Sequence, residues 1–108
     1  MQGSAYVEKM SFSQLLTKGI SLGLESALGV QAAGSVAFFI DPRIAVKDPK
    51  KYWESVDKMF KHNSQELRRK VIASICSTFR ISGDFTDFVT CVFAAKEKFL
   101  RDDIVDSR

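Results

Sequence analysis

The sequence predicts an all-α fold, a compact bundle of about five helices that forms a single domain over residues 1–108. Three observations predict it. Apolar residues recur at helical spacing along most of the chain. Capping residues and helix breakers separate the periodic segments. Hydrophobic residues make up 45% of the sequence, which is typical of a globular protein. The two ends, residues 1–10 and 103–108, are expected to fray.

The first helix is predicted over residues 12–28, with Ser11 or Ser13 as its cap. It is apolar around most of its circumference, as is typical of a helix buried on more than one side. Gly19, Gly23 and Ala27 recur every four residues and form a smooth face. Because each glycine costs about 1 kcal/mol of helix stability relative to alanine, this face indicates close approach of another backbone. That backbone belongs either to this chain or to a second copy, so the three residues are a candidate self-association face.

The second helix is predicted over residues 30–40, after a break at Gly29. It has almost no polar surface, and its last five residues would also suit a buried strand. We favour a helix because the sequence offers no second strand to satisfy the hydrogen bonds of the first. Asp41 ends the helix because the residue before a proline is disfavoured in the α conformation.

The third and fourth helices are predicted over residues 49–61 and 65–80. Asp48 caps the third, and Pro49 takes its first position, where the missing N–H costs nothing. Ser64 or Asn63 caps the fourth. The two apolar faces consist of Tyr52, Trp53, Val56, Met59 and Phe60, and of Leu67, Val71, Ile72, Ile75, Cys76 and Phe79.

The fifth helix is predicted over residues 84–102, with Asp84 or Ser82 as its cap. Lys96 falls within its apolar stripe, where a lysine typically keeps its charged end in water. The stripe expected to be buried consists of Phe85, Phe88, Val89, Val92, Phe93, Phe99 and Leu100.

The sequence contains no recognisable catalytic constellation. His62 is the single histidine and lies in a polar turn, so neither a metal cluster nor a base for a cysteine nucleophile is expected. The glycines do not have the spacing of a phosphate-binding loop, and the acidic residues are scattered. Cys76 and Cys91 lie in apolar runs, which favours buried thiols in a reducing compartment over a disulfide. We therefore predict a non-enzymatic protein without a metal or cofactor.

Residues 47–80 hold nine basic and four acidic side chains, a net charge of +5, whereas the whole chain carries +3. Two helices joined by a short turn could form a helix-turn-helix that binds nucleic acid, or the segment could bind an acidic protein. The favoured interpretation is a solvated face, because Glu54 and Asp57 interleave with the lysines. The candidate contact residues are Lys50, Lys51, Lys58, Lys61, Gln65, Arg68, Arg69 and Lys70.

A pattern of apolar spacings extends over residues 12 to about 76. A leucine-rich helix leads through a glycine-containing bend to an apolar helix, and a third helix follows with Asp48-Pro49, Tyr52-Trp53 and Met59-Phe60. This pattern resembles a family of small archaeal all-helical proteins of unknown function. The family has a glycine after the phenylalanine, where this chain has Lys61. The resemblance implies a helical fold and self-association, and it supplies no activity or site residues.

The apolar surface exceeds what five helices can hide, which predicts a protein-interaction module that forms a homodimer. The alternatives are the nucleic-acid-binding protein described above and a binder of a small apolar ligand between helices. The longest apolar stretch, residues 27–40, spans 14 residues, and a bilayer span needs about 20. No membrane span is therefore expected. Residues 1–10 lack the apolar core of a secretory signal, so a cytoplasmic location is expected.

Overall fold

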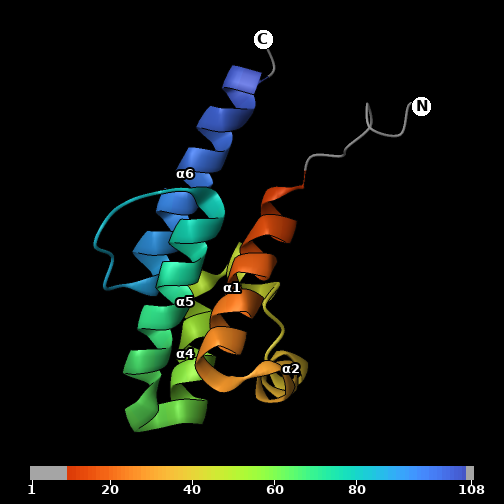
Figure 1. The fold of residues 1–108 in the computed structure, drawn as a ribbon, viewed down its shortest axis with the longest axis vertical. Helices are drawn as coiled ribbons and strands as arrows, with labels where there is room; N and C mark the ends of the chain where they lie inside the picture. Colours follow the sequence, from red (N-terminus) through yellow and green to blue (C-terminus); the bar gives the residue numbers. More distant parts are fainter. Residues whose placement is uncertain (1–9, 107–108) are drawn as a thin grey trace, which may run out of the picture.

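The computed structural model describes residues 10–106, with side chains to residue 102, and contains only helices in that part of the chain. The predicted all-α fold is confirmed, as is the helix over residues 30–39 that could have been a strand. A four-residue turn of helix, α3, and a 3-10 helix, η2, were not predicted. The elements are α1 (Phe12–Leu28), α2 (Val30–Phe39), α3 (Ile44–Lys47), α4 (Pro49–Phe60), η2 (Lys61–Asn63), α5 (Ser64–Phe79) and α6 (Phe88–Asp106) (Figure 1).

The starts of α1 and α4 follow the predicted caps, whereas Asn63 and Ser64 make no capping hydrogen bond at the start of α5. The Gln14 N–H donates to the Ser11 hydroxyl at 3.1 Å, and the Ser11 N–H donates to the Gln14 side chain at 2.8 Å. This reciprocal pair satisfies two N–H groups that the first turn of α1 leaves free. At α4 the Asp48 carboxylate accepts the Lys51 N–H at 3.0 Å. Each of α1, α2, α4 and α5 begins and ends within one residue of its predicted bounds.

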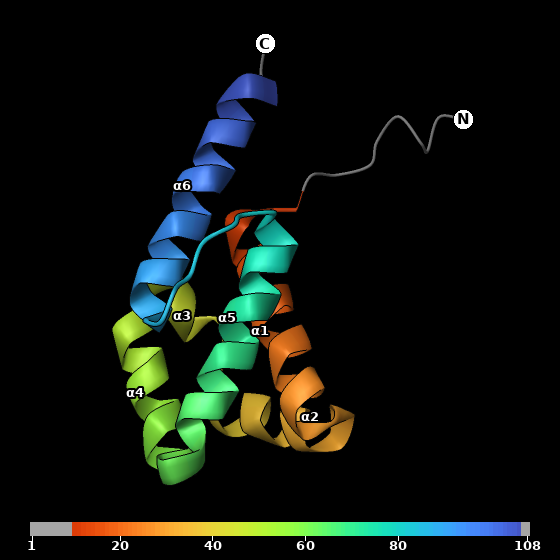
Figure 2. The same cartoon turned by 60° about the vertical axis from the view of Figure 1, so that its left-hand side comes forward.

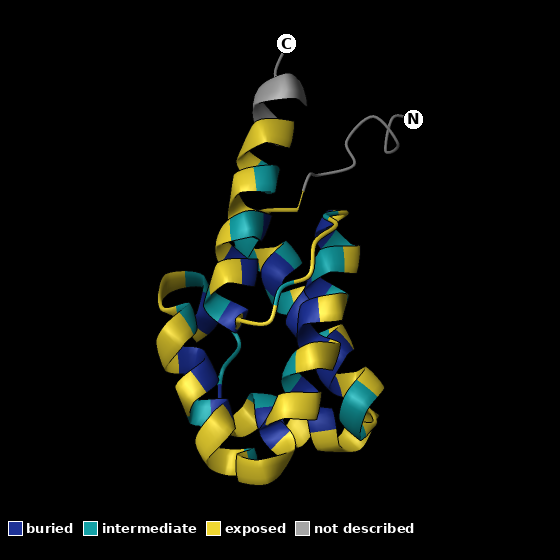
Figure 3. Ribbon diagram, turned by 90° about the vertical axis from the view of Figure 1, so that its left-hand side faces the viewer, coloured by how far each residue is buried: buried dark blue, intermediate teal, exposed yellow. Residues whose placement is uncertain are grey.

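The antiparallel pair α1 and α5 forms the centre of the bundle (Figures 1 and 2). α6 packs on α5 and α4, and its C-terminal part projects beyond the other helices, where its residues are mostly exposed or half-buried (Figure 3). α2 lies across the other end of the bundle. Among the described residues, α1 is the only helix that packs closely against α2.

The glycines of α1 allow its close contact with α5. A Cβ atom placed on Gly23 would lie 2.6 Å from the Val71 Cα atom, and one on Gly19 would lie 3.3 Å from the Thr78 hydroxyl. The Ser74 hydroxyl also donates to the Gly19 carbonyl at 2.6 Å. The close approach expected at this face therefore comes from the same chain, because α5 covers both Gly19 and Gly23 and Ala27 packs half-buried against the core. Of the two partners left open by the sequence, the structure has α5 in this position rather than a second copy.

The start of α6 also differs from the prediction. The helix begins at Phe88 rather than near residue 84, because the Asp87 carboxylate accepts the Thr90 N–H at 3.0 Å and takes the capping role. Residues 82–87 form an irregular loop in which the Phe85 ring lies against Gly83. At its other end α6 continues to Asp106, four residues past the predicted end. The expected fraying of residues 1–9 and 107–108 lies outside the described residues.

Aromatic side chains fill the space between α4 and α6. The Trp53 and Phe88 rings stack with centroids 5.0 Å apart, and the Tyr52 ring lies 5.6 Å from that of Phe88. These contacts fix the start of α6 on α4. Burial raises the pKa of the Tyr52 hydroxyl, with a smaller contribution from the charge of Asp41.

Candidate self-association surface

α2 is buried on one side only. Ala33, Val36 and Ile40 face the core, and the residues opposite them on the helix face solvent. Phe38 is 83% exposed and Phe39 is 72% exposed. Large aromatic side chains normally account for much of a core, so two adjacent exposed phenylalanines identify an uncovered apolar face.

The exposed face of α2 is uncharged and largely apolar, with Gln31 and Ser35 as its polar residues. The sequence has no charged residue between Glu25 and Asp41. Val30, at the first position of the helix, is 71% exposed. The rings of Phe38 and Phe39 contact each other edge to face, with centroids 5.3 Å apart and planes at 85°. The rings therefore already form one compact aromatic unit.

The area of this unit is comparable with known interaction patches. A buried phenylalanine covers on the order of 200 Å², so the exposed parts of Phe38 and Phe39 amount to roughly 300 Å². The largest apolar patch on a typical monomer covers about 300–600 Å² and often has a function. The two residues alone reach the lower end of that range.

A glycine lies at the centre of the same face. Gly34 is exposed, and a Cβ atom placed on it would meet no atom within 4 Å. It lies inside the helix, where a glycine costs about 1 kcal/mol relative to alanine. Gly19 and Gly23 are needed because α5 approaches them. No contact within the described part of the chain requires Gly34.

The apolar surplus expected from the first two helices lies on the exposed face of α2 and not on the glycine face of α1. Residues 36–40 suggested a buried segment, whereas Phe38 and Phe39 are the most exposed large hydrophobic residues described. The sequence signal for this face was the charge-free interval between Glu25 and Asp41. An exposed helix face normally carries charged residues, so a helix without any is expected to be covered on all sides.

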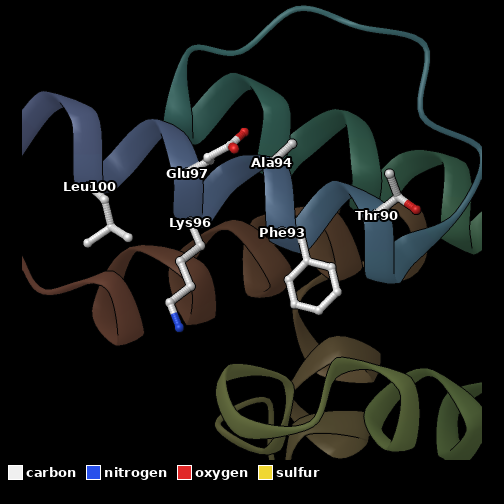
Figure 4. A pocket seen from close by; sticks show the side chains of 6 residues that line it. All are labelled: Thr90, Phe93, Ala94, Lys96, Glu97 and Leu100. Carbon is white, nitrogen blue, oxygen red and sulfur yellow. The ribbon is translucent and has the colours of Figure 1, made fainter.

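A second exposed apolar strip lies on α6. Phe93 is 62% exposed and Leu100 is 50% exposed, which corrects the prediction that both are buried. They border a shallow hollow of about 460 Å³ and point to the same side of the helix as Lys96 (Figure 4). Lys96 is itself exposed between them, and Glu97 also lines the hollow. Charged groups therefore interrupt this strip, in contrast to the face of α2.

The eight candidate contact residues are distributed over several sides of α4, η2 and α5. Seven of the eight are exposed, and Arg68 is half-buried. Arg68 and Lys70 lie about 200° apart around α5 because successive helical residues are about 100° apart. Arg69 is paired with Glu66 at 3.6 Å. The exposed residues are Lys50, Lys51, Lys58, Lys61, Gln65, Arg69 and Lys70.

The chemistry-bearing residues are placed as follows. His62 is exposed in η2. Both cysteines are free: Cys91 is buried in the core and Cys76 is half-buried beside it. Burial raises the pKa of the Cys91 thiol to about 12, and the neighbouring Cys76 contributes to the same shift. Cys91 is therefore a protonated thiol at neutral pH, the unreactive form of the group.

The described residues contain neither a metal-binding cluster nor a membrane-spanning helix. Residues 10–102 bring together no group of three or more His, Cys, Asp or Glu side chains suited to a metal ion. None of the helices in the described part of the chain is both long and apolar enough to cross a bilayer.

The chain was also compared with known proteins. No protein-family model, no curated protein and no solved structure matches it. The resemblance to small archaeal helical proteins therefore stays a prediction.

Proposed function

We propose that this protein is a non-enzymatic interaction module that forms a homodimer through the exposed face of α2. The observation that supports this most strongly is the exposure of Phe38 and Phe39 on a face without charge. Homodimer interfaces are more apolar than the rest of a protein surface and are depleted in charged residues. The face of α2 has both properties.

Approximate energies are consistent with a dimer. Two copies that cover these rings bury roughly 600 Å² of aromatic surface, which contributes on the order of 15 kcal/mol. Association itself costs on the order of 4–15 kcal/mol. The apolar gain and the association cost are therefore of the same order, and the residues around the rings determine the affinity. A standard interface of about 1,600 Å² leaves room for these neighbours.

The decisive measurement is the mass in solution. Light scattering at about 50 μM, a concentration that populates dimers of micromolar affinity, should give twice the 12.1 kDa of one chain. Phe38→Asp should weaken the dimer about a hundredfold, because it places a charge in the middle of an apolar contact. A wild-type mass of one chain at this concentration would exclude the proposal.

Phe93→Asp is the matched control. It makes the same substitution at an exposed phenylalanine on α6, far along the chain from α2. The dimer should persist in this variant. Loss of the dimer with Phe93→Asp, together with its retention in Phe38→Asp, would assign the interface to α6 and exclude α2.

We also propose a cytoplasmic location, supported by the two free cysteines of the core. Neighbouring free thiols are typical of a reducing compartment. Localisation of a tagged full-length chain by microscopy tests this proposal, and a signal outside the cytoplasm would exclude it.

A further inference from the structure

We infer that two copies of the chain meet through α2 in an antiparallel crossing, with a two-fold axis beside Gly34 and Ser35. This inference rests on the proposed homodimer and specifies its geometry. It follows from the distribution of large and small residues on the exposed face of α2, and from the position of Gly34.

The exposed face of α2 carries small side chains at its centre and large side chains at its C-terminal end. Gly34 and Ser35 are exposed at the centre, and Phe38 and Phe39 follow within one turn. An interface between identical copies must be complementary to itself. This face satisfies the requirement when the bulky end of one copy covers the small centre and N-terminal turn of the other.

An antiparallel arrangement achieves this match. With the two-fold axis beside Ser35, the Phe38 ring of one copy lies over residues 31–34 of the other copy, and the reverse contact forms at the same time. The opposed helix dipoles favour the same orientation. A parallel pair would place Phe38 against its own counterpart and leave a gap beside Gly34, contrary to the close packing of protein interfaces.

Gly34 has a role in this arrangement, and no contact among the described residues of one chain gives it another. Helix axes normally pack 8–10 Å apart, a distance set by the side chains at the contact. A glycine at the crossing point allows the second backbone to approach closely, as Gly19 and Gly23 allow α5 to approach α1. The open space around Gly34 is then the space that the second copy fills.

Cysteine cross-linking tests the orientation. Ser35 and Gln31 are both exposed on this face, one turn apart, so Ser35→Cys and Gln31→Cys should fold as the wild type does. In the antiparallel pair, two copies of residue 35 meet at the axis. Two copies of residue 31 are separated by about 12 Å along the helix, which is beyond the reach of a disulfide.

Oxidation of the purified full-length proteins with copper phenanthroline in air should therefore link Ser35→Cys into a dimer on a non-reducing gel. Gln31→Cys should yield at least about tenfold less cross-linked dimer than Ser35→Cys. The wild type, with only Cys76 and Cys91, gives the background level. Equal cross-linking of both variants would overturn the antiparallel orientation. Cross-linking of neither variant, with a dimeric wild type, would overturn pairing through α2 but not self-association. A monomeric wild type would overturn both.

Gly34→Gln provides a second, independent test. In a single chain the glutamine side chain enters open space, so the unfolding temperature of the monomer should stay the same or rise. The dimer should weaken about tenfold or more, because the new side chain separates the two backbones. Ala73→Gln, at an exposed position of α5, is the matched control and should leave the dimer intact. Full retention of the dimer in Gly34→Gln would overturn close approach at this residue.

Discussion

α1 and α2 are consecutive helices of similar composition, yet they are buried to very different extents. Both are apolar around most of their circumference, and both contain glycine at internal positions. α5 covers the glycine face of α1, whereas the glycine face of α2 is open. An apolar circumference therefore indicates that a helix has partners on several sides, but it does not indicate which of those partners belong to the same chain.

The strongest test of this comparison replaces one glycine from each helix by alanine. Gly23→Ala should lower the free energy of unfolding by about 3 kcal/mol, because the new Cβ atom would lie 2.6 Å from the backbone of Val71. Gly34→Ala should raise the stability of the monomer by about 1 kcal/mol through helix propensity. Urea denaturation at a protein concentration below the dissociation constant measures both values. Equal effects at the two positions would remove the distinction between the two faces.

The second test uses pH, to which the core and the α2 face should respond differently. Burial raises the pKa of Cys91 in the folded state to about 12, from its ordinary value of 9.0. The folded protein therefore holds a proton that the unfolded chain loses, so stability falls as the pH rises through this interval. Between pH 8 and 10 the loss from this thiol is on the order of 1 kcal/mol.

Denaturation of the wild type and Cys91→Ala across that range measures the difference in slope. The variant should lose less stability with pH, and parallel curves would contradict the assignment to Cys91. Dimer affinity should change far less than stability, because no titratable residue lies between Glu25 and Asp41. At the edge of the face, hydrogen bonds from Arg43 lower the pKa of Asp41, which therefore stays ionised throughout.

Local features of the helices could be predicted from the sequence, and features that depend on distant partners could not. Ser11, Asp48 and Gly29 act through backbone groups within a few residues, so the starts of α1 and α4 and the break between α1 and α2 were predicted correctly. The start of α6 was missed because Asp84 and Asp87 are equally suitable caps in the sequence. The position of Phe85 against Gly83 and of Phe88 against Trp53 favours Asp87.

The candidate site shows the same limit more clearly. Residues 36–40 are apolar in sequence, and periodicity alone cannot tell a core-facing phenylalanine from an exposed one when both sides of a helix are apolar. The position of α1 decides that Val36 and Ile40 are buried while Phe38 and Phe39 are not. The glycine face of α1 was likewise correctly identified as a close contact, but its partner could not be known before α5 was placed.

Lys61 is the opposite case to Gly34, because its backbone conformation favours glycine and the chain has a lysine at this position. It follows the last residue of α4 with φ 51° and ψ −112°, a region that side chains other than glycine rarely adopt. Lys61→Gly should raise the free energy of unfolding by about 1 kcal/mol, since relief of strain exceeds the added entropy of the unfolded chain. Lys61→Ala removes the same charge but keeps the strain, so it should bring no gain.

Chemical denaturation of the two variants separates the contribution of backbone strain from that of charge. An equal gain in both would assign the effect to charge, and a loss in Lys61→Gly would show that the turn between α4 and α5 tolerates lysine without strain.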